Sequence, residues 1–191
     1  MPANPRSDVR LTYDDFLRFP DDGKRHEIID GVHYVTPSPG RRHQQLSGRL
    51  YFSLAEHLRA HPSQGEVYYA PFDVVVSHWD VVEPDLLLVT RDQMEILTEK
   101  NVRGTPALVV EILSPSTRRT DEITKRKLYE RSGVQEYWVV DPELDVVKVY
   151  RRSEGAFGQA LELSAERREA LTTPLLPGWS AALHELFASP A

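Results

Sequence analysis

Two carboxylates interrupt apolar stretches of the chain that otherwise have the pattern of buried strands. Glu111 lies inside the run from Ala107 to Leu113, and Asp85 lies inside the segment EPDLLLV. Apolar runs of this length are typical of strands that are covered on both faces. Burial of an unpaired charge costs roughly several kcal/mol, so each carboxylate needs a positive partner, either a basic side chain or a metal ion.

The two carboxylates fall in neighbouring predicted strands, which would place two like charges close together. Such a pair either shares a proton or binds a cation. Pro84 directly precedes Asp85 and donates no hydrogen bond, so it predicts a bend or a sheet edge there. We therefore expect Asp85 and Glu111 to converge on one divalent cation.

A lysine on the next helix is the third candidate. The segment from Thr120 to Ser132 predicts a helix. A turn of about 100° per residue gathers these side chains on one face: Asp121, Lys125, Leu128, Tyr129 and Ser132. By themselves, Asp121 and Lys125 would be a surface ion pair worth about 0.3–0.5 kcal/mol. Beside two carboxylates and a metal, the Lys125 ammonium would instead complete a hydrolytic site.

Arg126, Lys127 and Arg131 lie on other faces of this helix and are interpreted as solvated charges.

Two further candidates precede this region. Glu27 lies in the first arm of HEIIDGVHYV, which Asp30-Gly31 predicts to be a hairpin; its ordinary interpretation is a solvated strand residue. His43 begins an amphipathic helix that ends at Ala60, with leucines at every fourth position. A histidine at a helix terminus can act as a ligand or a base, but its usual role is structural.

The elements around these candidates indicate one mixed α/β domain. The predicted helices are Leu11 to Phe19, with a capping box formed by Thr12 and Asp15, a turn around Met94, and a short closing helix. The predicted strands include 66–76 and 81–89, joined by a turn at 77–80, then 107–113, a second buried strand within GVQEYWVVDP, 146–152 and 161–163. We assign residues 1–191 to a single domain with its core at about 43–141.

Composition excludes several classes of protein. The 191 residues contain no cysteine, which removes disulfides, thiolate catalysis and cysteine-based zinc sites. No apolar run approaches the ~20 residues of a membrane helix, and the polar start MPANPRSDVR lacks a signal sequence, so we expect a cytoplasmic protein without a membrane partner. The net charge of -6 argues mildly against a protein that coats nucleic acid non-specifically, but a local basic surface could still surround an acidic site.

The ordered motifs resemble a known family. EPDLLLV, PALVVEILSPS, the D-x-x-x-K-x-x-x-Y spacing and GVQEYWVVDP together are similar to the Uma2 or DUF820 group of the PD-(D/E)xK nuclease superfamily. HEIIDG, the helix at His43 and the closing PLLPGW also match, so the resemblance covers nearly the whole chain.

The resemblance implies a restriction endonuclease-like core of α-β-β-β-α-β order, with an N-terminal hairpin and extra C-terminal strands. It places Asp85 in the second core strand and Glu111 in the third. One position departs from the superfamily pattern: Leu113 stands where a lysine is expected two residues after Glu111. In relatives of this group the lysine has moved to the following helix, where Lys125 matches.

The implied activity is metal-dependent hydrolysis of DNA phosphodiester bonds. Asp85, Glu111 and the carbonyl of Ile112 would hold Mg²⁺ or Mn²⁺ as oxygen ligands, and Lys125 would orient the attacking water. Glu27 would complete the acid cluster, and His43 would contact the phosphate or a nearby water.

DNA contact would fall to a basic stretch near the acid site. Between residues 118 and 131, six basic side chains exceed three acidic ones. A homodimer would let two sites cut both strands of a duplex, although no residue pattern indicates one.

Two alternatives stand beside this hypothesis. The first is a nuclease-like fold that binds nucleic acid or protein without cutting, against which the intact Asp85, Glu111 and Lys125 argue. The second is a purely structural role in which arginines satisfy the buried acids. No P-loop, dinucleotide fingerprint or G-x-S-x-G elbow indicates a different enzyme class.

Overall fold

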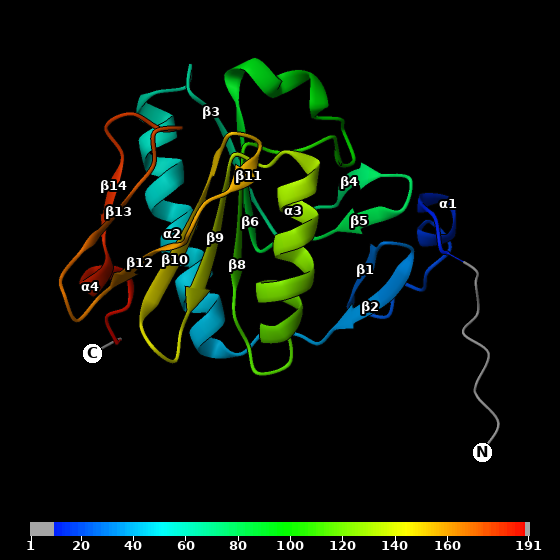
Figure 1. Ribbon diagram of the computed structural model, residues 1–191, viewed down its shortest axis with the longest axis horizontal. Coiled ribbons are helices and arrows are strands. Elements are labelled where there is room, and N and C mark those ends of the chain that lie inside the picture. Colours follow the sequence, from blue (N-terminus) through cyan, green and yellow to red (C-terminus); the bar gives the residue numbers. More distant parts are fainter. Residues whose placement is uncertain (1–9, 190–191) are drawn as a thin grey trace.

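The computed structural model describes residues 10–189, and these form a layered α/β structure (Figure 1). Its main sheet has the strand order β11-β10-β9-β8-β6-β3, with β12 also paired to β10. The strands of this sheet are β3 (Gly65–Tyr69), β6 (Leu86–Thr90), β8 (Leu108–Ile112), β9 (Glu136–Asp141), β10 (Val146–Ser153), β11 (Ala156–Phe157) and β12 (Leu161–Ser164). Strands β8 and β9 are parallel, and the other neighbouring pairs are antiparallel.

Helices cover both faces of the main sheet. Helix α2 (Arg41–Ala60) packs on one face through the leucines at every fourth position: Leu46, Leu50, Leu54 and Leu58. The helix on the other face begins with a π-helical turn, η2 (Thr120–Lys125), and continues as α3 (Arg126–Ser132) (Figure 1). If only the main sheet and its covering helices are considered, the chain order is α2, β3, β6, β8, η2-α3 and β9, with elements outside this sheet inserted between β3 and β8.

The alternation of side chains along β8 decides where the central carboxylate points. Val110 and Ile112 belong to the hydrophobic cluster under α2, whereas Val109 belongs to the cluster under α3. Because successive side chains of a strand point to opposite faces, Glu111 shares the α3 face with Val109. The strand period therefore aims this carboxylate at the helix that carries Lys125.

A second sheet of order β2-β1-β5-β4-β7 lies beside α3 (Figure 1). Its strands are β1 (Arg25–Ile29), β2 (Val32–Thr36), β4 (Val74–Ser77), β5 (Asp80–Val82) and β7 (Val102–Arg103). Strands β1 and β2 form the predicted hairpin, and its turn residues Asp30 and Gly31 both have positive φ values, 54° and 76°. These dihedral angles explain why Asp-Gly stands at this turn.

The prediction of two long strands at 66–76 and 81–89 was wrong, because each segment divides between the two sheets. The first becomes β3 and β4, and the second becomes β5 and β6. Pro71 and Pro84 lie in the two breaks, where a residue without an N–H group cannot continue a strand ladder. The break at Pro84 leaves Asp85 one residue ahead of β6, not inside a strand.

The other predicted elements are present with small changes in their bounds, and the strand pair near the C-terminus was not predicted. The first helix is only α1 (Tyr13–Phe16), with the predicted capping box between Thr12 and Asp15. The turn around Met94 is a 3-10 helix, η1 (Arg91–Ile96). The chain closes with the paired strands β13 (Ala170–Thr172) and β14 (Ser180–Ala182) and the short helix α4 (Leu183–Leu186).

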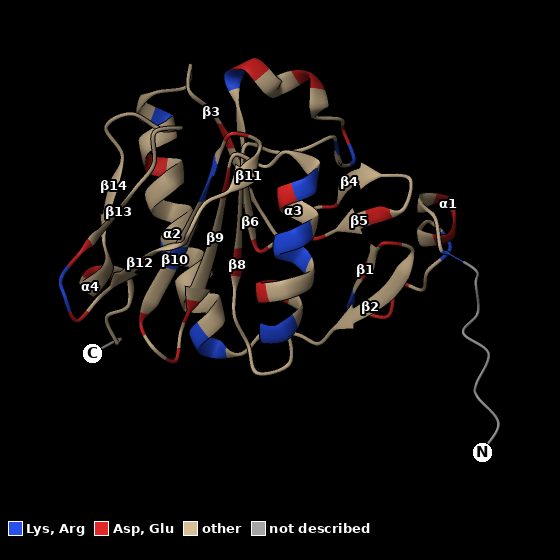
Figure 2. Cartoon of the chain, viewed as in Figure 1, with Lys and Arg blue, Asp and Glu red and all other residues tan. Residues whose placement is uncertain are grey.

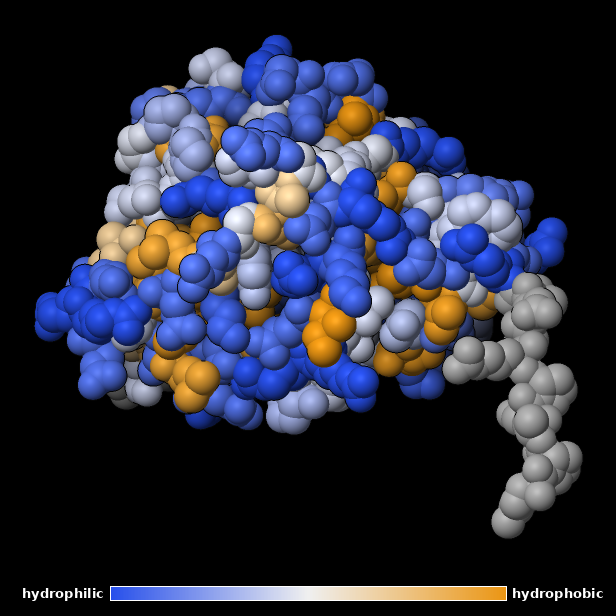
Figure 3. Space-filling view, viewed as in Figure 1, coloured by the Kyte–Doolittle hydropathy of each residue, from blue (hydrophilic) through white to orange (hydrophobic). Residues whose placement is uncertain are grey.

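The surface is mixed in polarity. Figure 3 shows apolar side chains interspersed with hydrophilic ones on the face that it presents. Among the described residues, no helix has the length and apolar character needed to cross a membrane.

Candidate active site

Asp85 and Glu111 come together where β6 meets β8. Leu86 pairs with Val110 in this antiparallel ladder, so the residues preceding Leu86 and following Val110 are neighbours across the strands. The backbone N–H of Ile112 donates to Asp85 Oδ2 at 2.7 Å, which ties the two segments together. Both residues are buried: Asp85 is 3% exposed and Glu111 is 1% exposed. The tertiary structure thus brings together the two acids that the sequence singled out.

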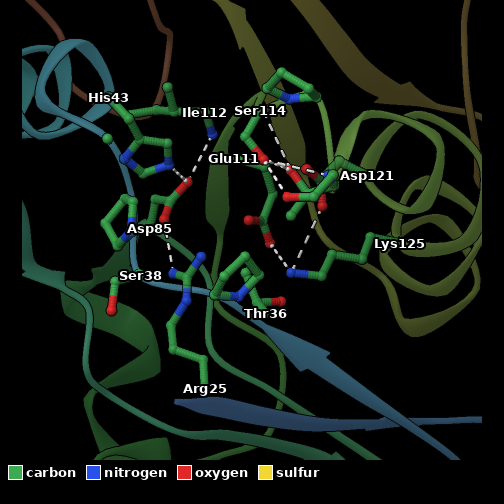
Figure 4. A pocket seen from close by; sticks show the side chains of 16 residues that line it. Arg25, Thr36, Ser38, His43, Asp85, Glu111, Ile112, Ser114, Asp121 and Lys125 are labelled. Atoms are coloured by element: carbon green, nitrogen blue, oxygen red, sulfur yellow. Dashed lines mark hydrogen bonds and ion pairs between the residues drawn. The ribbon is translucent and has the colours of Figure 1, made fainter. Parts of the chain in front are cut away.

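Lys125 reaches this pair from the other side of the cluster (Figure 4). Its Nζ lies 2.9 Å from Glu111 Oε1 and 2.8 Å from Glu27 Oε1. Asp121 Oδ1 lies 3.7 Å from the same nitrogen. Lys125 is buried, so its interpretation as half of a surface ion pair is wrong.

Glu27 is also buried, which contradicts its ordinary interpretation as a solvated strand residue. It lies in β1 of the second sheet, and its Oε1 accepts a hydrogen bond from the backbone N–H of Glu83 at 2.9 Å. The same oxygen contacts Lys125, so the second sheet supplies the ammonium with a carboxylate partner that does not come from its own helix.

Asp85 is held by two side chains that converge from distant segments. Arg25 of β1 donates to Asp85 Oδ1 at 2.7 Å. His43, in the first turn of α2, places Nε2 3.0 Å from Asp85 Oδ2 (Figure 4). His43 is therefore in the site, and in this arrangement one ring nitrogen is already committed to Asp85.

The protonation behaviour of the cluster follows from burial and from the uneven distribution of charge. Burial raises the pKa of Glu111 well above its usual value, and Lys125 only partly opposes this shift. Burial acts on Asp85 in the same direction, but the hydrogen bond from His43 and the charge of Arg25 outweigh it and lower the pKa of Asp85 to about 2. For Lys125, burial favours the neutral amine, but Glu111, Glu27 and Asp121 outweigh it and raise the pKa. Asp85 is consequently ionised and Lys125 is an ammonium ion.

No role in the site was assigned from the sequence to three residues that the structure places there: Arg25, Asp121 and Tyr129. Tyr129 donates from its hydroxyl to Glu111 Oε1 at 2.8 Å. Asp121 and Tyr129 had a visible signal, because they share the helical face of Lys125. Arg25 had none, since its contact with Asp85 joins residues 60 positions apart.

Asp121 is the least satisfied member of the cluster. It is 1% exposed, and within residues 10–189 neither carboxylate oxygen has a hydrogen-bond partner. Burial raises its pKa to about 6. An oxygen-rich, under-neutralised group of this kind is an expected feature of a site that takes up a cation.

A cavity of about 230 Å³ opens onto these side chains. Asp85, Glu111, Asp121, Lys125 and His43 line it, together with the loop at 36–40 and the Ser/Pro loop at 114–117. The site is therefore open to a small group such as a water molecule or one phosphate, while its charged members stay buried.

The donor set is suited to a hard divalent cation. Glu111 Oε1 accepts hydrogen bonds from Lys125 and Tyr129. No described residue donates a hydrogen bond to Oε2, which faces away from Lys125 (Figure 4). In the described part of the chain, no group of three or more His, Cys, Asp or Glu side chains forms a ready-made metal cage. Mg²⁺ does not need one, because it commonly keeps several waters and takes one or two carboxylates.

The basic stretch proposed for DNA contact is largely neutralised by acids. Arg118 pairs with Asp141 and Glu143, and Arg131 pairs with Asp30 and Asp80. Blue and red segments alternate along η2-α3 in Figure 2. The local excess of positive charge in the sequence therefore does not translate into a strongly basic surface.

Comparisons with known proteins agree with this architecture. A solved structure of a "putative nuclease belonging to DUF820" from Anabaena variabilis superposes with a TM-score of 0.77. It is 18% identical in sequence, and the match covers 93% of this chain and 97% of the other. This likeness shows that the chain shares the mixed α/β fold of that protein. No curated protein matches the chain.

The family model described as "Uma2: Putative restriction endonuclease" matches residues 13–184, which include both sheets and every side chain of the site. The protein belongs to the Uma2 family.

Proposed function

We propose that this protein is a metal-dependent endonuclease that hydrolyses phosphodiester bonds of DNA at the Asp85, Glu111 and Lys125 site. One observation carries the proposal: a buried ammonium contacts Glu111, next to Asp85, at a cavity that opens to solvent. Family membership supports the nuclease class, and the geometry supports these residues as its active site.

Asp85, Glu111 and the carbonyl of Ile112 would hold Mg²⁺ or Mn²⁺, because all three offer the oxygen ligands that these ions prefer. The bound ion would lower the pKa of a water molecule and neutralise negative charge on the phosphate. Arg25 and the ion would share the charge of Asp85, since Arg25 already contacts Oδ1.

Lys125 orients the attacking water by donating a hydrogen bond from Nζ. Glu27 and Glu111 hold Nζ between them, and the raised pKa of Lys125 keeps it charged. Tyr129 fixes Glu111 through Oε1 and leaves Oε2 for the cavity. A preorganised donor of this kind costs no reorganisation when the reaction occurs.

His43 acts on Asp85, not directly on the phosphate. Its Nε2 contacts Asp85 Oδ2, and the backbone N–H of Ile112 contacts the same oxygen. These two contacts set the direction of the carboxylate. Glu27 and His43 are therefore positioning residues in this proposal.

The test is cleavage of plasmid DNA and of labelled oligonucleotides with Mg²⁺ or Mn²⁺. We expect wild-type protein to cut, EDTA to stop the reaction, and Glu111→Gln to abolish it. Exposed Glu95 provides the matched control, and Glu95→Gln should cut like wild type. If cleavage requires a homodimer, its rate should fall on dilution, in parallel with the dimer fraction measured by mass photometry.

A binding module without catalysis is the second candidate. One observation favours it: Arg25 and His43 already supply Asp85 with partners on both oxygens. Binding of DNA by wild-type protein, with no cleavage under any divalent metal, would select this alternative.

A further inference from the structure

A second, more open hollow adjoins the catalytic cavity and continues past Asp85. Its volume is about 450 Å³, and it shares Arg25, His43 and Asp85 with the catalytic cavity. Its lining also includes Gln44 and Ser47, in the first two turns of α2, and Tyr69 at the end of β3. We call this hollow the Tyr69 groove. The two hollows therefore lie side by side, with Arg25, His43 and Asp85 lining both.

Tyr69 presents an aromatic ring next to the proposed reaction centre. The following residue, Ala70, donates its backbone N–H to the carbonyl oxygen of Asp85 at 3.1 Å. Tyr69 is 56% exposed, although it belongs to a strand of the main sheet. Its ring makes an edge-type contact with Tyr51 of α2, with centroids 4.6 Å apart at 65°. This contact leaves much of Tyr69 exposed, and the residue lines the groove.

The charge of the groove does not favour binding by phosphate attraction alone. Lys24 and Arg25 line it, but so do Asp21, Glu83 and Asp85. Lys24 Nζ is also paired with Asp22 at 3.0 Å. Binding here must therefore draw on contacts other than an excess of positive charge. Stacking of a base on an aromatic ring is such a contact, and it tolerates any base because each has a π face.

We propose that the Tyr69 groove binds a nucleotide adjacent to the scissile phosphate, with its base stacked on Tyr69. This inference rests on the proposed nuclease function and narrows its substrate. A base inside a duplex already has both faces covered by its neighbours, so only an unpaired or displaced base can stack on a protein ring. The preferred substrate is accordingly single-stranded or locally opened DNA.

Equilibrium binding tests the groove without relying on cleavage. Fluorescence anisotropy would compare a labelled single-stranded 12-mer with a hairpin duplex of the same sequence, in EDTA. We expect Tyr69→Ala to weaken single-strand binding about 5- to 150-fold, the range for loss of one stacked base, and to change duplex binding less. Tyr69→Phe keeps the ring and should bind like wild type. Phe52 is 66% exposed on α2 outside the groove lining, so Phe52→Ala is the matched control and should also bind like wild type.

An abasic scan locates the stacked base. Each nucleotide of the strand is replaced in turn by an abasic residue, and binding is measured for wild type and Tyr69→Ala. At one position, loss of the base should weaken wild-type binding and leave Tyr69→Ala unaffected, because the partner ring is already missing. Equal losses for both proteins at every position would overturn the proposal, as would unchanged single-strand binding by Tyr69→Ala.

The two proposals can fail separately. Suppose that wild type and Tyr69→Ala cleave single strands equally with Mg²⁺ and also bind them equally. This result would overturn the proposed base-binding role of the groove and leave the nuclease function standing. Ring-dependent binding without any cleavage by wild type would overturn the nuclease function and retain the groove as a single-strand binding site.

Discussion

Lys125 contacts Glu111 from the helix that follows the strand, with Nζ 2.9 Å from Oε1. Leu113, two residues after Glu111, cannot supply this ammonium. Leu113 is buried in the hydrophobic cluster under α3. The ammonium beside this carboxylate therefore comes from η2, and not from the segment that carries Glu111.

We predict that Lys125→Met lowers the rate of Mg²⁺-dependent DNA cleavage by about 10²-fold or more, because its contact to the water acts mainly in the transition state. DNA affinity should change little. The same substitution leaves a buried acid cluster without its cation, so the free energy of unfolding should fall by about 3–5 kcal/mol. Cleavage is thus measured at a temperature where circular dichroism shows the variant folded. Exposed Lys127 is the control, and equal cleavage by Lys125→Met and Lys127→Met would reject the assignment.

Calorimetric titration with Mn²⁺ tests the metal ligands. Asp85→Asn and Glu111→Gln should each weaken binding by about tenfold or more, because each removes a charged oxygen ligand. Glu95→Gln should bind like wild type, since Glu95 is exposed and does not line the cavity. Unchanged affinity in both site variants would exclude a shared metal site at these residues.

Glu27→Gln tests the positioning role of Glu27. The amide keeps the size of the side chain but removes the charge that faces Lys125 at 2.8 Å. We expect kcat to fall by about tenfold while KM for DNA and Mn²⁺ affinity stay near wild type, because the loss acts through Lys125. A rise in KM at constant kcat would instead place Glu27 in substrate binding.

Asp121→Asn should stabilise the metal-free protein at neutral pH. The pKa of Asp121 is raised from 3.8 to about 6, so the folded state binds its proton more tightly than the unfolded state. The free energy of unfolding of the wild-type protein therefore falls by on the order of 1–3 kcal/mol as the pH rises from about 4 to above 6. The variant has no carboxylate at this position, so its stability does not fall for this reason. Urea unfolding in EDTA should show the variant more stable at pH 8 and equal to wild type near pH 4. A difference that is independent of pH would refute the titration of Asp121 as its cause.

The sequence by itself determined which side chains of one helix or one strand share a face. The period of two along β8 aims Glu111 at α3, and the helical period gathers Asp121, Lys125 and Tyr129 on one face. The hairpin at Asp30-Gly31 and the leucine face of α2 were predictable for the same reason. These features depend on residues a few positions apart, where backbone geometry alone sets the direction of a side chain.

Only the tertiary structure decided what those side chains meet. Arg25 reaches Asp85 across 60 positions, and Glu27 reaches Lys125 from a different sheet. The division of 66–76 and 81–89 between two sheets places Tyr69 beside Asp85, and neither segment shows this in its local pattern. Such contacts depend on how separate elements pack around a shared core, and hydrophobic periodicity specifies a buried face without specifying its partner.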